Sequence, residues 1–320
     1  MQKTQLATTE LGSTGLEITR VGFGAWAIGG GDWEFGWGPQ DDEESIAAIH
    51  RALELGVNWI DTAAAYGFGR SEEVVGRALE GVADRPYVFT KCSLIEGPGR
   101  TVEHSLKRDS IRREAEASLT RLGVDAIDLY QIHWPNPEED LEEGWAAMAE
   151  LRDEGLVRHI GVSNYSAAQM RRIQRIAPIE TLQPQYSLIA RDVEREVLPF
   201  AESEDIGVIV YSPMGSGLLT GKMTRERIQG LADDDWRKHD ERFQEPQLSE
   251  HLSIADRVTS LADRLGVSPG AVAVAWTLRN PAVDGAIVGL RRPDQVDELI
   301  GSATVTLSDA DMAELEGRRS

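Results

Sequence analysis

Four side chains that can carry or steer protons stand at or near the ends of short apolar runs in the first half of the sequence. Asp61, Lys91 and His133 each close such a run, and Tyr66 follows Asp61 by five residues. In a closed barrel of parallel strands the carboxyl ends of the strands share one face, so these residues can converge. A lone histidine is more often structural, and an Asp–Lys pair is more often a plain salt bridge. The joint occurrence of all four is what indicates a site.

The four residue types fit the reduction of a carbonyl group. A carbonyl that accepts a hydride becomes an alkoxide and needs a proton, which Tyr66 could supply. The ordinary pKa of tyrosine is about 10, and a nearby ammonium group favours the phenolate, so we expect Lys91 to lower the pKa of Tyr66. A buried lysine needs a counter-ion, which Asp61 can provide. His133 can donate a hydrogen bond to the substrate oxygen as negative charge develops on it.

Short apolar segments alternate with amphipathic segments along the chain. The apolar runs are rich in Val, Ile or Tyr and mostly do not alternate with polar residues, which is typical of parallel strands buried on both faces. They lie at residues 19–24, 58–61, 87–91, 126–133, 158–163, 180–183, 207–211 and 285–289. Helical patterns lie at residues 42–55, 72–79, 105–122, 141–154, 166–176, 191–203 and 268–279, with one further helix after Ser308.

This alternation predicts an α/β protein, either a closed (β/α)8 barrel of the TIM type or an open doubly wound sheet. The barrel is favoured because eight units follow one another evenly, with no linker, internal repeat or change in composition. We therefore expect a single domain over residues 1–320. Residues 212–253, after the seventh strand, include the acidic run 233–235 and show no strand pattern, which is typical of a functional lid or an insertion.

One dinucleotide-binding motif is present but does not fit its context. Gly22, Gly24 and Ala27 match GxGxxA, yet three consecutive glycines at 29–31 follow, where a nucleotide-binding fold needs a helix. We instead expect a glycine-rich loop at the mouth of the first strand. Trp26, together with the tryptophans at 33 and 37, could wall a pocket there or simply pack.

Composition excludes several classes of function. Of 320 residues, 41% are hydrophobic and 27% are charged, and no apolar run is long enough to span a membrane. A net charge of −21 makes nucleic acid a poor partner. The single cysteine, Cys92, excludes an internal disulfide, and with no secretion signal we expect a cytoplasmic protein. No feature of the sequence indicates an oligomeric state.

Longer motifs resemble those of the aldo-keto reductase superfamily. They are DTAAAYG at 61–67, FTK at 89–91, IHW at 132–134 and GVSNY at 161–165, in the family's order along nearly the whole chain. The glycine-rich start and YSPMGSG at 211–217 are similar to a bacterial branch that also resembles potassium-channel β-subunits. The resemblance implies a (β/α)8 barrel that reduces aldehydes or ketones to alcohols by hydride transfer from a nicotinamide.

The resemblance also implies roles for individual residues. The catalytic tetrad would be Asp61, Tyr66, Lys91 and His133, with Tyr66 as the proton donor. The nicotinamide would be held by Ser163, Asn164 and Gln183 at its carboxamide and by Tyr211 stacked on its ring. The loop around the pyrophosphate would comprise Ser212, Pro213, Met214, Gly215 and Gly217. The adenosine phosphate would lie near Gly289, Arg291, Arg292 and Gln295, and the substrate pocket would include Trp26 and Trp134.

The arginines at 291 and 292 favour NADP(H), with NAD(H) as the alternative, because a guanidinium suits phosphate oxygens. The family often has asparagine after the residue matching Glu298, whereas this chain has Leu299. The adenine is therefore held differently or more weakly. Two other functions are weighed: a regulatory subunit that keeps the fold and cofactor, and a metal-dependent barrel hydrolase or isomerase. The second needs clustered ligands, but only His133 ends a strand, so we expect no metal.

Overall fold

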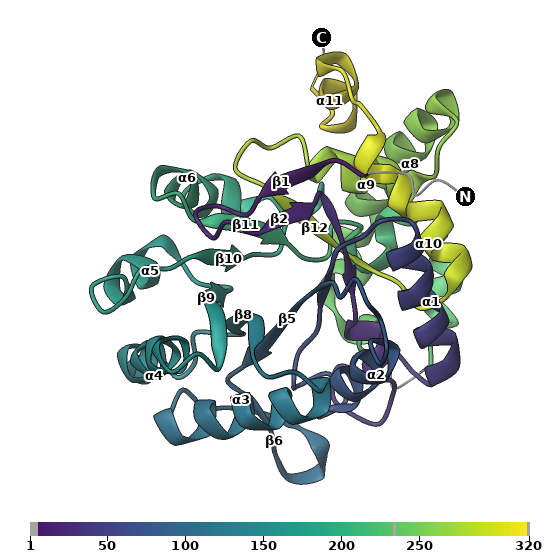
Figure 1. Ribbon diagram of the computed structural model, residues 1–320. Helices are drawn as coiled ribbons and strands as arrows, with labels where there is room; N and C mark the ends of the chain where they lie inside the picture. The colour runs from purple at the N-terminus through teal and green to yellow at the C-terminus, as the bar shows by residue number, and fades with distance from the viewer. Residues whose placement is uncertain (1–5, 233–234, 319–320) are drawn as a thin grey trace.

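A closed ring of parallel strands forms the centre of the molecule (Figure 1). The computed structural model describes residues 6–232 and 235–318, so the ends of the predicted domain 1–320 and most of the acidic run 233–235 lie outside the described residues. This ring confirms the (β/α)8 barrel over the open sheet. Its strands, in order around the ring, are β3 (Val21–Gly24), β4 (Trp59–Asp61), β5 (Tyr87–Cys92), β8 (Ile127–Ile132), β9 (Val157–Ser163), β10 (Thr181–Gln183), β11 (Gly207–Val210) and β12 (Gly285–Gly289), which pairs back to β3.

Helices follow the strands and lie outside the ring (Figure 1). They are α1 (Asp42–Glu54), α2 (Arg70–Ala78), α3 (Arg108–Leu122), α4 (Leu141–Asp153), α5 (Ala167–Ile173), α6 (Val197–Ser203), α7 (Arg225–Gln229), α8 (Gln247–Leu265), α9 (Pro269–Thr277), α10 (Pro293–Leu299) and α11 (Asp309–Leu315). Side-chain caps begin several of them: Ser166 forms a capping box with Gln169, and Ser268 caps α9 ahead of a proline. The predicted helix at 191–203 is shorter, because its first turn is a separate 3-10 turn.

Sequence patterns missed two hairpins and one long helix. The hairpin of β1 (Thr8–Glu10) and β2 (Glu17–Thr19) precedes the barrel, and the hairpin of β6 (Leu94–Glu96) and β7 (Val102–His104) leaves the end of β5. Strands of three residues are too short to show a periodic pattern. Helix α8 begins inside the segment 212–253, which was predicted as one long loop.

Alternation along the strands places polar side chains above an apolar layer inside the barrel. Successive side chains of a strand point to opposite faces, so residues two apart share the interior. The lower layer packs against the β1–β2 hairpin and comprises Trp59, Phe89, Leu129, Ile209 and Ile287. Two positions further along four of these strands lie Asp61, Lys91, Gln131 and Tyr211. The hairpin and the apolar layer thus close one end of the barrel, and the polar layer faces the other end.

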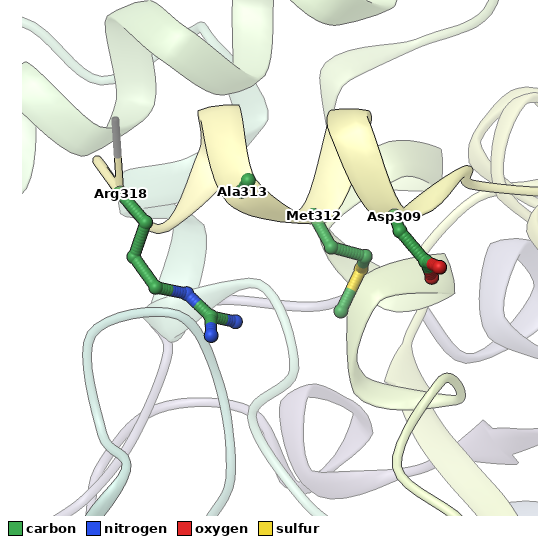
Figure 2. Close-up of a pocket in the computed structure, with 4 residues that line it drawn as sticks. All are labelled: Asp309, Met312, Ala313 and Arg318. Atoms are coloured by element: carbon green, nitrogen blue, oxygen red, sulfur yellow. The ribbon is translucent and has the colours of Figure 1, made fainter. Parts of the chain in front are cut away.

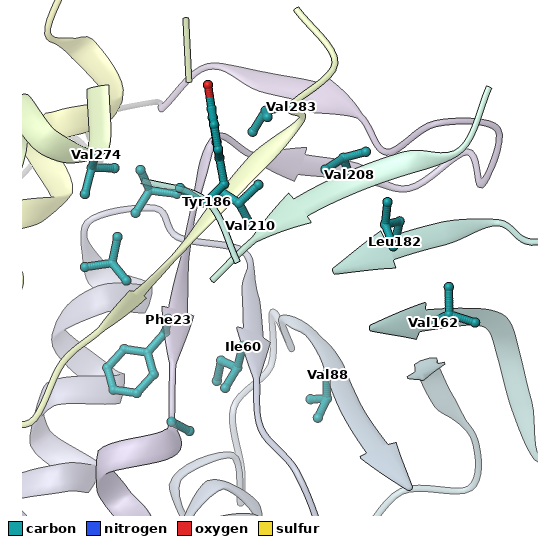
Figure 3. Close-up of a cluster of buried hydrophobic side chains, with 14 of the residues drawn as sticks. Phe23, Ile60, Val88, Val162, Leu182, Tyr186, Val208, Val210, Val274 and Val283 are labelled. Carbon is teal, nitrogen blue, oxygen red and sulfur yellow. The ribbon is translucent and has the colours of Figure 1, made fainter. Parts of the chain in front are cut away.

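The remaining strand residues form the main core between barrel and helices. Figure 3 shows this layer, with Ile60, Val88 and Val208 pointing from the strands. Because each strand is covered on both faces, burial of these Val, Ile and Leu side chains contributes on the order of 2 kcal/mol apiece. This core surrounds the strand ends where the polar layer begins.

Candidate active site

The four predicted tetrad side chains lie together at the carboxyl end of the barrel. Lys91 Nζ donates to Asp61 Oδ1 at 2.5 Å and to the carbonyl oxygen of Thr62 at 2.9 Å. The Tyr66 ring lies with its centroid 5.3 Å from Lys91 Nζ and 5.7 Å from the His133 ring. Asp61 is the last residue of β4, and Lys91 is the last inward-facing residue of β5. His133 directly follows β8, and Tyr66 lies in the loop after β4.

The pKa of Tyr66 moves in the opposite direction from the one predicted. Burial raises the pKa of Tyr66 well above its usual value, and the neighbouring Asp61 and Tyr211 raise it further. The expected lowering by Lys91 fails because the ammonium bonds directly to Asp61 and the phenol is buried. Tyr66 is therefore a neutral phenol at neutral pH, which is the form that can donate a proton.

The other three members of the tetrad are also tuned by burial. Burial lowers the pKa of His133 well below its usual value, and the charges of Lys91 and His104 lower it further. Burial likewise lowers the pKa of Lys91 and raises that of Asp61, while their mutual attraction opposes both shifts. His133 is thus a neutral imidazole with one N–H to donate.

Two glutamines extend this network inside the barrel. Gln183 Nε2 donates to Asp61 Oδ2 at 2.8 Å and to Gln131 Oε1 at 2.9 Å. Both amide protons of Gln183 are used, so a ligand can meet this side chain only through Oε1. Gln131 was not among the predicted site residues, although its place two positions after Leu129 in β8 signals an inward side chain. Its Nε2 is buried and has no partner among the described residues.

The residues predicted to hold the nicotinamide form one connected group. Ser163 Oγ donates to the carbonyl oxygen of Gln183 at 2.7 Å, and Asn164 Nδ2 donates to Ser163 Oγ at 3.0 Å. The Tyr211 hydroxyl donates to Asn164 Oδ1 at 2.8 Å. Asn164 Nδ2 also donates to the carbonyl oxygen of His133 at 3.0 Å, so this group is joined to the tetrad.

The segment from Ser212 to Gly217 curls in a way that suits an anion. Ser212, Gly215, Ser216 and Gly217 have positive φ values of 53°, 58°, 54° and 101°. The left-handed backbone folds the loop back on itself, and the N–H groups of Gly215 and Gly217 donate to the carbonyl oxygens of Ser212 and Met214 at 2.9 and 3.2 Å. The Ser216 hydroxyl is buried without a partner among the described residues. That hydroxyl is the unpartnered donor which this loop, with the predicted Pro213 and Met214, can offer to an anion.

A surface cavity of about 510 Å³ lies at the start of α10, lined by Pro39, Gln40, Asp41, Glu44, Arg291 and Arg292. Both predicted phosphate-binding guanidinium groups already have protein partners. Arg291 Nε donates to Gln40 Oε1 at 2.6 Å, and its terminal nitrogens reach the carbonyl oxygens of Trp37 and Pro39.

Arg292 forms a two-point ion pair with Asp294 at 3.0 and 3.1 Å. Gln295 Oε1 accepts from the backbone N–H groups of Arg291 and Arg292, so this side chain braces the turn after Gly289. Leu299 is buried against Gly270 in the core and does not face this cavity.

Aromatic rings cover the tetrad. Trp26 stacks on Tyr66 at a centroid distance of 6.2 Å, and Trp33 lies 6.4 Å from the same ring. Trp236, from the long segment after β11, stacks on the other side of Trp26 at 5.5 Å. Trp37 meets both Trp26 and Trp236 edge-on. These tryptophans therefore both pack together and wall the site. Trp236 was missed because it lies in a segment without a periodic pattern.

A second cavity, of about 420 Å³, lies beside α11 and is lined by Asp309, Met312, Ala313 and Arg318 (Figure 2). None of the tetrad residues lines it.

Within residues 6–232 and 235–318, no three His, Cys, Asp or Glu side chains are grouped so that they could hold a metal ion. Over the same residues, no helix combines the length and apolar character needed to cross a membrane.

Comparison with known proteins places the chain in a family. The model of the Aldo/keto reductase family matches residues 20–319. Aldo-keto reductase YhdN of Bacillus subtilis is 42% identical over 96% of this chain and 92% of its own length. The NADH-specific methylglyoxal reductase of Escherichia coli is 36% identical over 94% of each chain. The glycerol dehydrogenase AKR11B4 of Gluconobacter oxydans superposes with a TM-score of 0.87 at 37% identity, covering 99% of this chain and 95% of that one. The barrel and these matches together show that the chain belongs to the aldo/keto reductase family.

Proposed function

We propose that this protein reduces aldehydes or ketones to alcohols, with NADP(H) as its preferred cofactor and Tyr66 as the proton donor. The observation that carries the proposal is the convergence of Asp61, Tyr66, Lys91 and His133 at one barrel end, with Lys91 bonded to Asp61 and facing the Tyr66 ring. The names of the E. coli methylglyoxal reductase and the G. oxydans glycerol dehydrogenase support small oxygenated carbonyls or alcohols as substrates.

The residues present fit a nicotinamide dinucleotide. The unpartnered Ser216 hydroxyl and the left-handed backbone around it would hold the pyrophosphate. Ser163, Asn164 and the free oxygen of Gln183 would hold the carboxamide beside Tyr211. When bound there, the cofactor supplies the hydride.

The protein's own side chains would manage the proton and the developing charge. Tyr66, kept neutral by burial, donates its hydroxyl proton to the substrate oxygen. His133 donates a hydrogen bond to the same oxygen from its single N–H, which stabilises the negative charge that develops there. Lys91, fixed by Asp61, then faces the phenolate and lowers its energy. Trp26 and Trp33 beside the Tyr66 ring would limit the access of water, which would strengthen each of these interactions.

The preference for NADP(H) rests on Arg292. Its pair with Asp294 is exposed, and exposed pairs contribute at most about 1 kcal/mol, so a phosphate can take the place of the carboxylate. Arg291 instead fixes the turn at residues 37–40. The E. coli relative named as NADH-specific shows why the preference needs a direct measurement.

A carbonyl panel tests the proposal. Purified protein is assayed with NADPH and with NADH against short aldehydes, hydroxyketones, sugars and aromatic ketones, beside Tyr66→Phe as the control. We expect turnover of small carbonyls, faster with NADPH, and none with Tyr66→Phe. Absence of turnover with every carbonyl, while either cofactor binds, would favour a regulatory subunit instead.

A further inference from the structure

One buried residue next to the tetrad has an unusual backbone. Ser93 follows β5, has no exposed surface, and has a φ of +81°, a conformation that residues other than glycine rarely adopt. Such residues persist where the surrounding structure holds them, and they often mark functional positions. The contacts that hold the Ser93 backbone in this conformation therefore indicate what the residue does.

Three segments bind Ser93 at once. Its backbone N–H donates to Glu114 Oε2 in α3 at 2.9 Å. Its carbonyl oxygen accepts from the backbone N–H of Ser105 at 3.0 Å, which closes the β6–β7 hairpin. Its hydroxyl donates to the carbonyl oxygen of Trp134 and accepts from the Trp134 N–H, both at 3.3 Å.

These bonds join two of the strand ends that carry tetrad residues, those of β5 and β8. Lys91 lies two positions before Ser93, and His133 lies directly before Trp134. The backbone N–H of His133 also donates to the carbonyl oxygen of Cys92 at 3.0 Å. The Ser93 hydroxyl thus fixes the end of β8 against the end of β5, and with it the spacing of His133 and Lys91.

Glu114 supports this junction from outside the barrel. It is half-buried, and its second oxygen, Oε1, accepts from Ser110 Oγ at 3.2 Å. A buried carboxyl group is costly unless it is hydrogen-bonded, so the bond to the Ser93 N–H fixes both partners. Neither Glu114 nor Ser93 is reached by the bonds that link Lys91, Asp61 and Gln183 inside the barrel.

We propose that Ser93 and Glu114 are positioning residues of the carbonyl reduction: they set the placement of His133 relative to Lys91 without touching substrate or cofactor. The inference rests on the proposed function, because it assigns the tetrad its catalytic roles. Small errors of placement matter greatly in catalysis, since the reacting atoms must meet at about 3 Å.

The sharpest test is Ser93→Gly. Glycine adopts the left-handed backbone without strain, so this change removes the hydroxyl while relieving the conformation. We expect kcat for carbonyl reduction to fall at least tenfold, while the Kd of the cofactor changes less than twofold and the Tm stays the same or rises. If Ser93 served folding alone, kcat of the variant would fall only if its Tm fell as well.

Two variants of Glu114 provide the second arm. Glu114→Gln keeps an oxygen that can accept from the Ser93 N–H, so it should retain at least half of kcat. Glu114→Ala should lose at least tenfold, with cofactor Kd unchanged. Leu122→Ala is the matched control: it weakens the same helix from a buried position that no bond of the junction involves. It should lower Tm and leave kcat intact below the unfolding transition.

Retention of kcat within twofold in Ser93→Gly would overturn the inference, as would an equal loss in Leu122→Ala. Tyr66→Phe, assayed in the same series, separates this failure from that of the proposed function. If Tyr66→Phe is inactive but Ser93→Gly is not, only the positioning role falls. If Tyr66→Phe keeps its activity, the roles given to the tetrad fall as well.

Discussion

Tyr66 shows how burial, rather than a neighbouring cation, sets the protonation of a candidate catalytic group. Burial and the nearby charge of Asp61 raise the pKa of its hydroxyl and keep the proton on the oxygen. Lys91 is close to the ring but is already bonded to Asp61. In the proposed mechanism the ammonium therefore acts after the proton has left Tyr66, when the phenolate needs a partner.

Replacing Tyr66 by phenylalanine tests this role. We expect kcat to fall by three or more orders of magnitude, because the change removes both the acid and a hydrogen bond to the developing oxyanion. The cofactor Kd should change less than twofold. Retention of more than about a tenth of kcat, measured at saturating substrate, would remove Tyr66 from the mechanism.

Arg292 should control the choice between the two cofactors. We predict that Arg292→Ala lowers the ratio of kcat/KM for NADPH over NADH by about ten- to a hundredfold, since one charge-assisted contact contributes about 1.5–3 kcal/mol. Arg291→Ala should weaken both cofactors, because Arg291 supports residues 37–40 through their carbonyl oxygens. An unchanged ratio in Arg292→Ala, or a parent enzyme that prefers NADH, would contradict the assignment.

Glu114 should make folding stability depend on pH. Burial raises its pKa to about 8, although bonds from Ser110 and Ser93 oppose the shift. Because the folded pKa exceeds the unfolded one, the folded state is favoured below about pH 4.5 and loses this advantage as the pH rises through 8. Relative to the parent, Glu114→Gln should therefore gain Tm steadily between pH 5 and 8. A pH-independent difference would show that the carboxyl group ionises freely.

At the scale of elements, sequence patterns placed the barrel strands within two residues, because buried parallel strands form distinct apolar runs ended by polar residues. The same logic brought Asp61, Lys91 and His133 to one face. Sequence patterns failed for residues whose role depends on how side chains pack in the folded barrel. Gln131 was overlooked because an inward glutamine resembles any polar residue in a strand.

Other features depend on tertiary contacts that no local pattern reveals. Trp236 reaches Trp26 across a long irregular segment, and Ser93 takes its conformation from α3 and the end of β8. The pKa of Tyr66 was predicted in the wrong direction, because a motif gives the neighbours of a group but not its burial. The pairing of Asp61 with Lys91 could be predicted from the residue types. How far burial removes water from Tyr66 can be known only from the folded protein.

The segment after β11 should respond to cofactor as a unit. It has its own small apolar cluster, formed by Leu218, Met223, Ile228, Phe243 and Leu248. Its start, Ser212 to Gly217, is the loop proposed to hold the pyrophosphate. We predict that NADP⁺ increases amide protection across residues 212–232 in hydrogen exchange, while α4 on the opposite side of the barrel is unchanged. Equal protection of residues 212–232 with and without cofactor would show that this segment does not close over the cofactor.

At the scale of the whole molecule, the negative net charge of the protein repels the anionic cofactor that the site is proposed to bind. The chain carries a net charge of −21, and the proposed cofactor is itself an anion. The fields that act on an approaching ligand are those of the whole charge distribution, whereas Arg292 acts only on contact. Rates of encounter and strength of binding should therefore respond differently to salt.

We predict that the association rate constant of NADPH rises with ionic strength between 0.01 and 0.15 M. The Debye length shrinks from about 30 Å to about 8 Å over this range, which removes most long-range repulsion. NADH, which lacks the extra phosphate, should show a shallower rise. Stopped-flow quenching of tryptophan fluorescence can follow both, because Trp26 and Trp33 lie beside the Tyr66 ring. A rate constant that falls with salt would mean that the arginines at the start of α10 draw the cofactor in from a distance, and that the acidic surface lies elsewhere.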